Sequence, residues 1–387
     1  MAREVYLDNN ATTQVAPEVL EAILPFFSQS YGNPSSAHLF GGRAKRALER
    51  AREQVAELVG ASPEEVIFTS GGTESDNAAI RGILEALPHK RHIVTTKVEH
   101  PAVLNLCKIL EGRGYRVTYL AVDRKGYLNL DELREAIGDD TALVSIMFAN
   151  NETGVIFPVE EIGKICRDKG VIFHCDATQA VGKVPVDMRG SLIDLLSLSG
   201  HKFHAPKGIG ALVIREGIPW VPLLVGGHQE EGRRAGTENV PAIVGLGKAS
   251  ELAKETLKDQ ERVRALRDEL EGEILREIPD VIVNGEGGER LPNTTNLSFR
   301  GIEGEALLLM LSEEGIAASS GSACSSGDPE PSHVLQAMGV PADFIHGTLR
   351  LSLSRYNTKE DIEYILEHLP PIVGHLRSLS PLWSQAG

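Results

Sequence analysis

The chain has 387 residues, of which 42% are hydrophobic and 24% are charged, as in an ordinary soluble globular protein. Its net charge of −15 argues against a nucleic-acid surface, which would need a basic face. The first residues, MAREVYLDNN, contain no apolar run, and the densest apolar stretch, residues 306–311, is too short to span a bilayer. We therefore expect a cytoplasmic protein without a signal peptide, which binds neither nucleic acid nor a membrane.

From residue 17 to residue 216, helical patterns alternate with short β-rich runs. The patterns predict helices at 17–27, 37–59, 101–112, 131–137 and 158–169. They predict strands at 66–70, 92–98, 116–122, 142–150, 171–177, 195–199 and 211–216. Several of these strands are apolar nearly throughout, as parallel strands covered on both faces are. The alternation therefore predicts an α/β domain with a mostly parallel sheet and helices on both sides.

The pattern changes after residue 240, where a long charged helical stretch covers 240–278. Short strands and helices then mix, with strands predicted at 281–283, 295–299 and 348–353 and helices at 304–314, 332–338 and 358–377. This mixture predicts a second, smaller α+β domain that the chain enters through a connecting helix.

Three of the four cysteines are predicted to be small core residues, because Cys107 and Cys166 lie on apolar helical stripes and Cys175 lies inside an apolar strand. No C-x-x-C pair is present, and the adjacent residues 174–176 would point to opposite faces of a strand, so we expect no metal site. Cys324 differs, because it lies in IAASSGSACSSG, where nothing nearby is bulky enough to bury a thiol.

In open α/β sheets, ligands bind at the carboxyl ends of the strands, and polar residues follow several of the predicted strands. Gly72 and Thr73 begin a helix after strand 66–70, where free N–H groups and the helix dipole favour an anion such as a phosphate. For this segment considered alone, a glycine turn with a threonine cap is the favoured interpretation. The other strand-end residues are His100, Asn151, Asp176, Gln179, Ser199, His201 and Lys202.

Together these residues supply phosphate binders, a carboxylate, a ring-shaped side chain and an amine on one edge of a sheet. That set is what pyridoxal 5′-phosphate requires: a lysine for the Schiff base, a carboxylate at the pyridinium nitrogen and a phosphate site. Lys202 is preferred to Lys207 as the lysine, because it directly follows a strand end beside Ser199 and His201, whereas Lys207 precedes a glycine turn.

Nine segments resemble, in order along the chain, the motifs of cysteine desulfurases of the NifS/IscS group: YLDNNATT (6–13), TSGGTESDN (69–77), VEHPAV (98–103), ANNETG (149–154), HCDATQAVGK (174–183), SLSGHKFHAPKGIGAL (197–212), RRAGTEN (233–239), SSGSACSSG (319–327) and LRLSLSRYNT (349–358). The resemblance implies a fold-type I enzyme that uses pyridoxal phosphate and forms a homodimer. It also implies a large cofactor domain, residues 15–255, and a small domain made of residues 1–14 and 256–387.

The resemblance also implies roles for single residues. Lys202 matches the Schiff-base lysine, Asp176 the partner of the pyridine nitrogen, Gln179 the residue near the ring hydroxyl, and His100 the histidine stacked on the ring and proposed as an acid/base. Thr73, beside Gly72, matches a phosphate binder, as do Ser199 and His201, and Thr237 matches a phosphate contact given to the other subunit's cofactor. Asn151 and Arg350 match groups that hold the substrate. Considered on its alternating strand alone, Arg350 could also be a surface residue.

Cys324 matches the catalytic cysteine, which takes the sulfur of L-cysteine as a persulfide and releases alanine. The implied recipient is an iron–sulfur scaffold protein of the NifU/IscU kind or a carrier for tRNA thiolation. Cys324 would contact a nascent cluster on the scaffold only transiently. The resemblance does not decide whether the enzyme serves nitrogenase or general cluster assembly. It also does not decide whether the enzyme acts on selenocysteine. Other pyridoxal phosphate enzymes, such as a selenocysteine lyase or an aminotransferase, are alternatives, as is a sulfur-relay protein without catalysis of its own.

Overall fold

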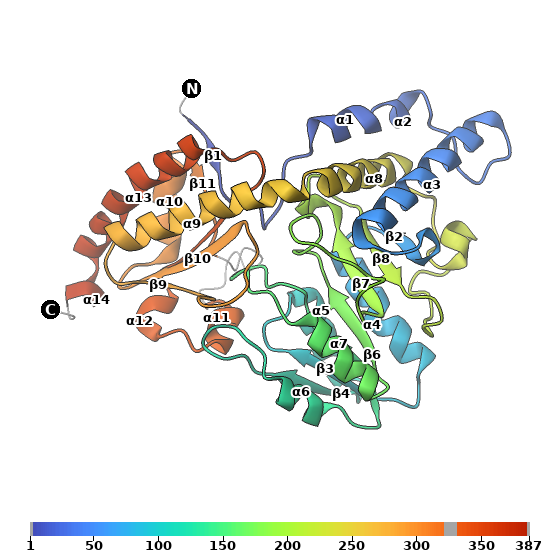
Figure 1. The fold of residues 1–387 in the computed structure, drawn as a ribbon, viewed down its shortest axis with the longest axis horizontal. Coiled ribbons are helices and arrows are strands. Elements are labelled where there is room, and N and C mark those ends of the chain that lie inside the picture. The colour runs from blue at the N-terminus through green and yellow to red at the C-terminus, as the bar shows by residue number, and fades with distance from the viewer. Residues whose placement is uncertain (1–2, 321–330, 385–387) are drawn as a thin grey trace.

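The computed structural model describes residues 3–320 and 331–384, so Cys324 lies outside the described residues. Figure 1 shows a larger body built around one sheet and a smaller body beside it, joined by the helices α8 (Val240–Glu255) and α9 (Gln260–Glu277). Within the described residues, no helix is both long and apolar enough to cross a membrane.

The larger body contains a seven-stranded sheet in the order β2-β8-β7-β6-β5-β3-β4. Its strands are β2 (Val66–Thr69), β3 (His92–Thr96), β4 (Arg116–Leu120), β5 (Thr141–Ser145), β6 (Ile172–Asp176), β7 (Leu195–Ser199) and β8 (Gly210–Ile214). Only β8 runs antiparallel to its neighbours, β2 and β7. The prediction of a mostly parallel sheet is confirmed, and the carboxyl ends of the other six strands share one edge.

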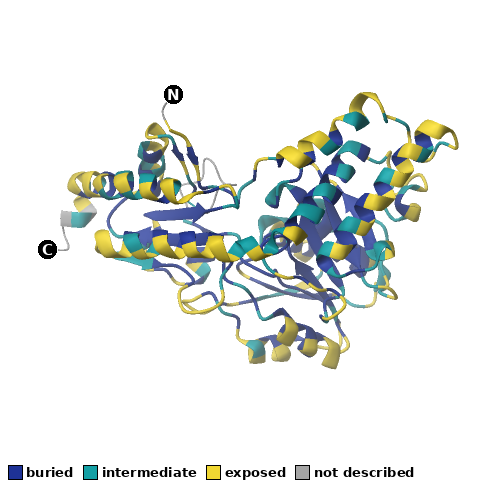
Figure 2. Cartoon of the chain, turned by 45° about the horizontal axis from the view of Figure 1, so that its top comes forward, coloured by how far each residue is buried: buried dark blue, intermediate teal, exposed yellow. Residues whose placement is uncertain are grey.

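Helices cover both faces of this sheet because its strands are apolar on both faces. Leu195 belongs to one apolar cluster, with residues of α4 and α5, while its neighbour Leu196 belongs to another, with residues of α3, α7 and α8. Figure 2 shows these layers as buried strands between helices that expose only their outer sides. The helices of this body besides α8 are α1 (Pro17–Ile23), α2 (Pro25–Ser28), α3 (Leu39–Val59), α4 (Gly72–Ala86), α5 (Pro101–Glu111), α6 (Leu130–Ala136) and α7 (Val159–Asp168).

The smaller body has a three-stranded antiparallel sheet, with β10 (Thr294–Phe299) between β9 (Val281–Val283) and β12 (Thr348–Ser352). The N-terminal strand β1 (Val5–Tyr6) pairs in parallel with β11 (Ile316–Ala317), so the beginning of the chain belongs to this body. Val5 and Leu7 share an apolar cluster with α9 and with the other helices that cover this sheet. The remaining helices of this part of the chain are α10 (Gly304–Glu313), α11 (His333–Ala337), α12 (Ala342–Ile345), α13 (Lys359–Leu379) and α14 (Pro381–Ser384).

Some elements differ from the sequence expectation. The helix predicted over 240–278 is two helices, because α8 ends at Glu255 and a short 3-10 turn, Leu257–Asp259, precedes α9. The strand predicted at 142–150 ends at Ser145, and the residues after it line the edge of the sheet as a loop. Val334 of α11 packs in the cluster of the larger body. The domain limits at residues 14/15 and 255/256 remain a prediction.

Candidate active site

A cavity of about 410 Å³ opens at the carboxyl edge of the seven-stranded sheet. Ten of the predicted site residues line it: Gly72, Thr73, His100, Asn151, Asp176, Gln179, Ser199, His201, Lys202 and Arg350. They come from segments after β2, β3, β5, β6 and β7, and from β12 of the smaller body, so the site lies where the two bodies meet. Sequence reasoning did not assign the remaining lining residues, which are Asn10, Ala11, Asp76, Met147, Ala149 and Thr178.

One end of the cavity is formed by the first turn of α4, which begins at Gly72. A side chain at Gly72 would come within 2.9 Å of Thr178 Oγ1, so only glycine lets the helix start this close to the segment after β6. The Thr178 hydroxyl is buried and has no hydrogen-bond partner among the described residues. Free N–H groups at this helix start, with the Thr178 and Thr73 hydroxyls nearby, can hold an anion.

His201 lines the same cavity, and its Nδ1 lies 3.1 Å from Thr12 Oγ1. Burial, with the nearby amine of Lys202, lowers the pKa of His201 to about 4. The imidazole is therefore neutral at pH 7, and it can donate one hydrogen bond to an anion without adding a charge.

Asp176 ends β6 and accepts a hydrogen bond from the N–H of Thr178 at 2.9 Å. Beneath it, His174 bonds Ser145 through Nδ1 and Ser197 through Nε2, each at 2.9 Å. Burial lowers the pKa of His174 to about 4, so this imidazole is neutral and supplies no counter-charge.

Asp76 lies 3.6 Å from His174 Nε2 and has one carboxyl oxygen without a partner among the described residues. Burial, and then the neighbouring Asp176, raise the pKa of Asp76 well above its usual range. The raised pKa favours the neutral form of Asp76 and so limits the build-up of negative charge in this part of the site.

His100 is the N-cap of α5, and its Nδ1 accepts a hydrogen bond from the N–H of Ala102 at 3.1 Å. This contact leaves the proton of the neutral ring on Nε2. Burial lowers the pKa of His100, and the neighbouring Lys202 and His333 act in the same direction, although Asp176 opposes them. A neutral ring at the wall of the cavity can stack on a flat ligand and exchange a proton through Nε2.

Lys202 follows β7 directly, in the short turn Gly200–Lys202. Its Nζ donates to the main-chain carbonyls of Asn10 at 2.7 Å and Ala11 at 2.9 Å. Lys207, the alternative lysine, is exposed and lies outside the lining of the cavity.

Asn10 is the residue that joins the site to both bodies. Its side-chain amide donates to Asn151 O and to Thr294 Oγ1, and its Oδ1 accepts from Asn293 and Lys183. Its main-chain groups bond Ser352, Gln179 and Lys202. These seven bonds use the whole hydrogen-bonding capacity of one asparagine. The segment YLDNNATT resembles a family motif, but the sequence does not show the distant residues to which Asn10 is hydrogen-bonded.

Arg350 of β12 is only 2% exposed, so the interpretation as a surface residue is wrong. Leu349 and Leu351, on either side of it, face the core of the smaller body, and the guanidinium therefore faces the cavity. Nη1 donates to Asn151 O at 3.0 Å and Nη2 to Asp8 Oδ1 at 2.7 Å. Nε is buried without a partner among the described residues, which leaves it for an incoming carboxylate.

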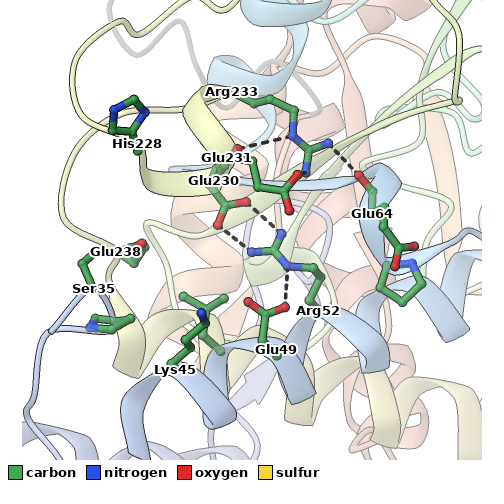
Figure 3. A pocket seen from close by; sticks show the side chains of 13 residues that line it. Ser35, Lys45, Glu49, Arg52, Glu64, His228, Glu230, Glu231, Arg233 and Glu238 are labelled. Atoms are coloured by element: carbon green, nitrogen blue, oxygen red, sulfur yellow. Dashed lines mark hydrogen bonds and ion pairs between the residues drawn. The ribbon is translucent and has the colours of Figure 1, made fainter. Parts of the chain in front are cut away.

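Thr237 is the one predicted site residue among the described ones that does not line the cavity, and it is exposed. Its segment begins at a turn in which Glu230 and Glu231 have φ values of 47° and 58°, a left-handed conformation that costs energy in residues with side chains. Figure 3 shows the ion pair that holds this turn. The Arg52 guanidinium donates two hydrogen bonds to the Glu230 carboxylate, at 2.7 and 2.9 Å.

Comparison with known proteins gives consistent results. The chain matches the aminotransferase class-V family over residues 5–365. It is 59% identical to a cysteine desulfurase of Trichormus azollae, over 99% of this chain and 97% of that protein. It is 54% identical to the cysteine desulfurase NifS of Azotobacter vinelandii, over 99% and 96%. A solved NifS-like protein superposes with a TM-score of 0.91 at 42% identity, over 97% of this chain and 100% of that chain.

Proposed function

Since the chain belongs to the aminotransferase class-V family and is a cysteine desulfurase that uses pyridoxal 5′-phosphate, we propose which of its residues carry the reaction. The enzyme mobilises the sulfur of L-cysteine for iron–sulfur cluster assembly. The observation that supports our assignment is the convergence of an amine, a carboxylate and a helix N-terminus on one cavity.

The cavity fits the cofactor. Two residues that line it, Asp76 and Thr178, each have a buried polar atom, Oδ1 and Oγ1, without a hydrogen-bond partner among the described residues, as expected of a site built around a polar ligand. The residues assigned to the phosphate are Gly72, Thr73, Ser199 and His201. Those assigned to the ring are His100, Asp176 and Gln179. When bound, pyridoxal phosphate withdraws electrons from the substrate Cα and so makes its proton removable.

Lys202 is assigned to hold the cofactor through its Nζ and to move the proton at the substrate Cα. Arg350 binds the substrate carboxylate through the guanidinium edge that includes Nε, and Asn151 keeps that guanidinium in place through its carbonyl. His100 exchanges a proton through Nε2, which its contact with Ala102 leaves protonated in the neutral ring.

Cys324, as thiolate, attacks the substrate sulfur, and the bond between that sulfur and the substrate carbon breaks. The sulfur stays on Cys324 as a persulfide, and the electron pair of the broken bond remains with the carbon, which takes a proton and leaves as alanine. Thiolates are strong nucleophiles even at a low thiolate fraction. Cytoplasmic delivery of the persulfide sulfur to a scaffold protein of the NifU/IscU kind completes the proposed function.

The enzyme is proposed to act as a homodimer. Large apolar side chains are exposed on α1, α2, the start of α3 and the connections between them, namely Leu20, Leu24, Phe27, Tyr31, Leu39 and Phe40. Figure 1 shows α1 and α2 along the top of the larger body, above α8, and the start of α3 at its upper right. A second copy of the chain would cover this surface, and its Thr237 would then contribute to the phosphate site.

Borohydride reduction followed by peptide mapping tests the assignment of Lys202. The reduced cofactor should stay on the peptide that contains Lys202, and Lys202→Ala should lose both this adduct and alanine formation. Lys207→Ala is the matched control and should keep both. Reduction onto another lysine in the wild-type enzyme would refute the assignment.

A further inference from the structure

A second lysine, Lys183, is buried beside the cavity and has no part in the reaction described above. It is 6% exposed, although lysine is rarely buried without an ionic partner, and no carboxylate pairs with it among the described residues. Its Nζ donates instead to Gln179 Oε1 at 2.5 Å and to Asn10 Oδ1 at 3.1 Å. Burial lowers the pKa of Lys183 well below 10.5, and the cations Lys202 and Arg350 lower it further.

The two oxygens that Lys183 holds belong to residues of the cofactor site. Gln179 lines the cavity and uses one amide N–H to reach the Asn10 carbonyl at 3.0 Å. That same carbonyl receives the Nζ of Lys202 at 2.7 Å. Both lysine amines therefore donate to Asn10. Lys183 donates to its side-chain oxygen and Lys202 to its main-chain oxygen.

We propose that Lys183 is a positioning residue for the cofactor site: its amine fixes Gln179 and Asn10, and through Asn10 it fixes the Nζ of Lys202. The proposal rests on the proposed role of Lys202. A methionine at position 183 would fill the same volume, so packing alone does not require an amine there. The amine is required for its hydrogen bonds to Gln179 and Asn10. It also places a second amine near Lys202, so that a proton on either one disfavours a proton on the other. Lys202 must be unprotonated to attack a carbonyl group.

The test compares Lys183→Met with Lys207→Met, which removes an exposed lysine five residues from Lys202. The first measurement is the Kd of pyridoxal phosphate for the apoprotein. Lys183→Met should bind it about tenfold more weakly, because two buried hydrogen bonds are lost, while Lys207→Met should bind it like the wild type.

The second measurement needs no cofactor. Apoprotein is treated with trace acetic anhydride across a pH series, and acylation of Lys202 is read by mass spectrometry against the exposed Lys169. The pH midpoint for Lys202 should rise by about half a unit or more in Lys183→Met, and should stay nearly unchanged in Lys207→Met. Loss of packing alone would not move this midpoint.

Wild-type affinity together with an unchanged midpoint in folded Lys183→Met would overturn the proposal. If that variant does not fold, Lys183→Gln serves instead, because it keeps a donor and removes the ionisable amine; it should raise the midpoint with a smaller loss of affinity. Failure of the assignment of Lys202 itself would appear differently, as a borohydride adduct on another lysine.

Discussion

The guanidinium of Arg350 lies 2.7 Å from the carboxylate of Asp8, and the Arg350 side chain is only 2% exposed. The group assigned to the substrate carboxylate therefore already has a counter-ion in the protein, the half-buried carboxylate of Asp8. A buried arginine without such a partner would be costly, but a negative charge beside the guanidinium also repels the incoming carboxylate. Asp8 thus stabilises the empty site at the expense of substrate affinity.

Asp8→Asn should lower the KM for L-cysteine several-fold and lower the thermal stability, because the substrate becomes the main counter-ion of Arg350. Arg350→Lys should raise KM about 100-fold, as expected when one partner of a buried charge pair is truncated. Steady-state alanine formation and a melting curve measure both effects. A higher KM in Asp8→Asn would show that Asp8 orients Arg350 more than it competes with the substrate.

Glu99 makes stability depend on pH in an unusual direction. It is fully buried, its Oε1 accepts hydrogen bonds from Thr96 and from the N–H of Met147, and burial raises its pKa from 4.5 to about 8. Between these values the unfolded chain releases a proton that the folded chain keeps, so the free energy of unfolding falls as pH rises. His174, with a folded pKa of about 4 against 6.5, acts oppositely, but only below pH 6.5.

Glu99→Gln should therefore be more stable than the wild type at pH 8, by a few kcal/mol at most, and the advantage should shrink towards pH 6.5. Denaturant unfolding at several pH values between 6.5 and 8 measures the difference. Glu161→Gln, on the exposed face of α7, is the control and should parallel the wild type. A pH-independent difference between Glu99→Gln and the wild type would contradict the protonated state of Glu99.

The turn before Thr237 depends on one buried ion pair. Glu230 accepts from Arg52 and also from the N–H of Phe68 at 3.0 Å, and it holds two left-handed residues in place. Glu230→Gln should cost about 3–5 kcal/mol of stability because Arg52 is left buried without its partner. Glu231→Gly should be neutral or stabilising, because glycine adopts positive φ without strain. If a melting experiment shows equal destabilisation by both variants, the positive φ of Glu231 is not a source of strain that glycine relieves.

Self-association should be coupled to cofactor binding. Phe27→Asp places a charge on the exposed apolar surface of α2 and should favour monomers in sedimentation experiments. Thr237→Ala should stay dimeric but bind the cofactor more weakly, because only the phosphate contact is lost. A fully loaded, fully active monomer would remove the proposed role of Thr237.

The segment that contains Cys324 should matter for sulfur delivery more than for chemistry. Deletion of residues 325–328 shortens the chain by four residues, or about 13 Å of reach. Reductant-driven alanine formation should be partly retained, whereas transfer of labelled sulfur to a scaffold protein should be largely lost. Undiminished transfer would show that the segment serves only to position the thiol.

The sequence predicted the fold and the site unequally well. Apolar runs such as VIFHCDA identify buried parallel strands, and the rule that ligands bind at strand ends then locates Asp176, Gln179 and Lys202 without a structure. Periodicity could not reveal the break near Thr256, because helical residues continue on both sides of it. It also could not predict the pairing of β1 with β11, two short strands from distant parts of the chain.

The residues missed at the site are those whose function depends on distant partners. Asn10 precedes every predicted strand, and only folding brings it to Lys202 and Ser352. In the sequence, Asp76 is an ordinary acidic residue near the start of a helix, and its burial beside Asp176 is a property of the sheet packing. Lys183 was simply one of 39 lysines and arginines.

The central claim is that Cys324 alone takes the sulfur. The other three cysteines are buried, and burial raises the pKa of Cys107 and of Cys166 to about 12 and that of Cys175 well above its usual range, so none of them supplies a thiolate at neutral pH. The direct test is a single turnover of the cofactor-loaded enzyme with sulfur-labelled L-cysteine and no reductant, in which alanine and labelled sulfur on each cysteine peptide are counted. We predict equal amounts of alanine and of labelled sulfur on the Cys324 peptide, and neither product with Cys324→Ala. Full alanine formation by Cys324→Ala, or labelled sulfur on another cysteine, would contradict the account.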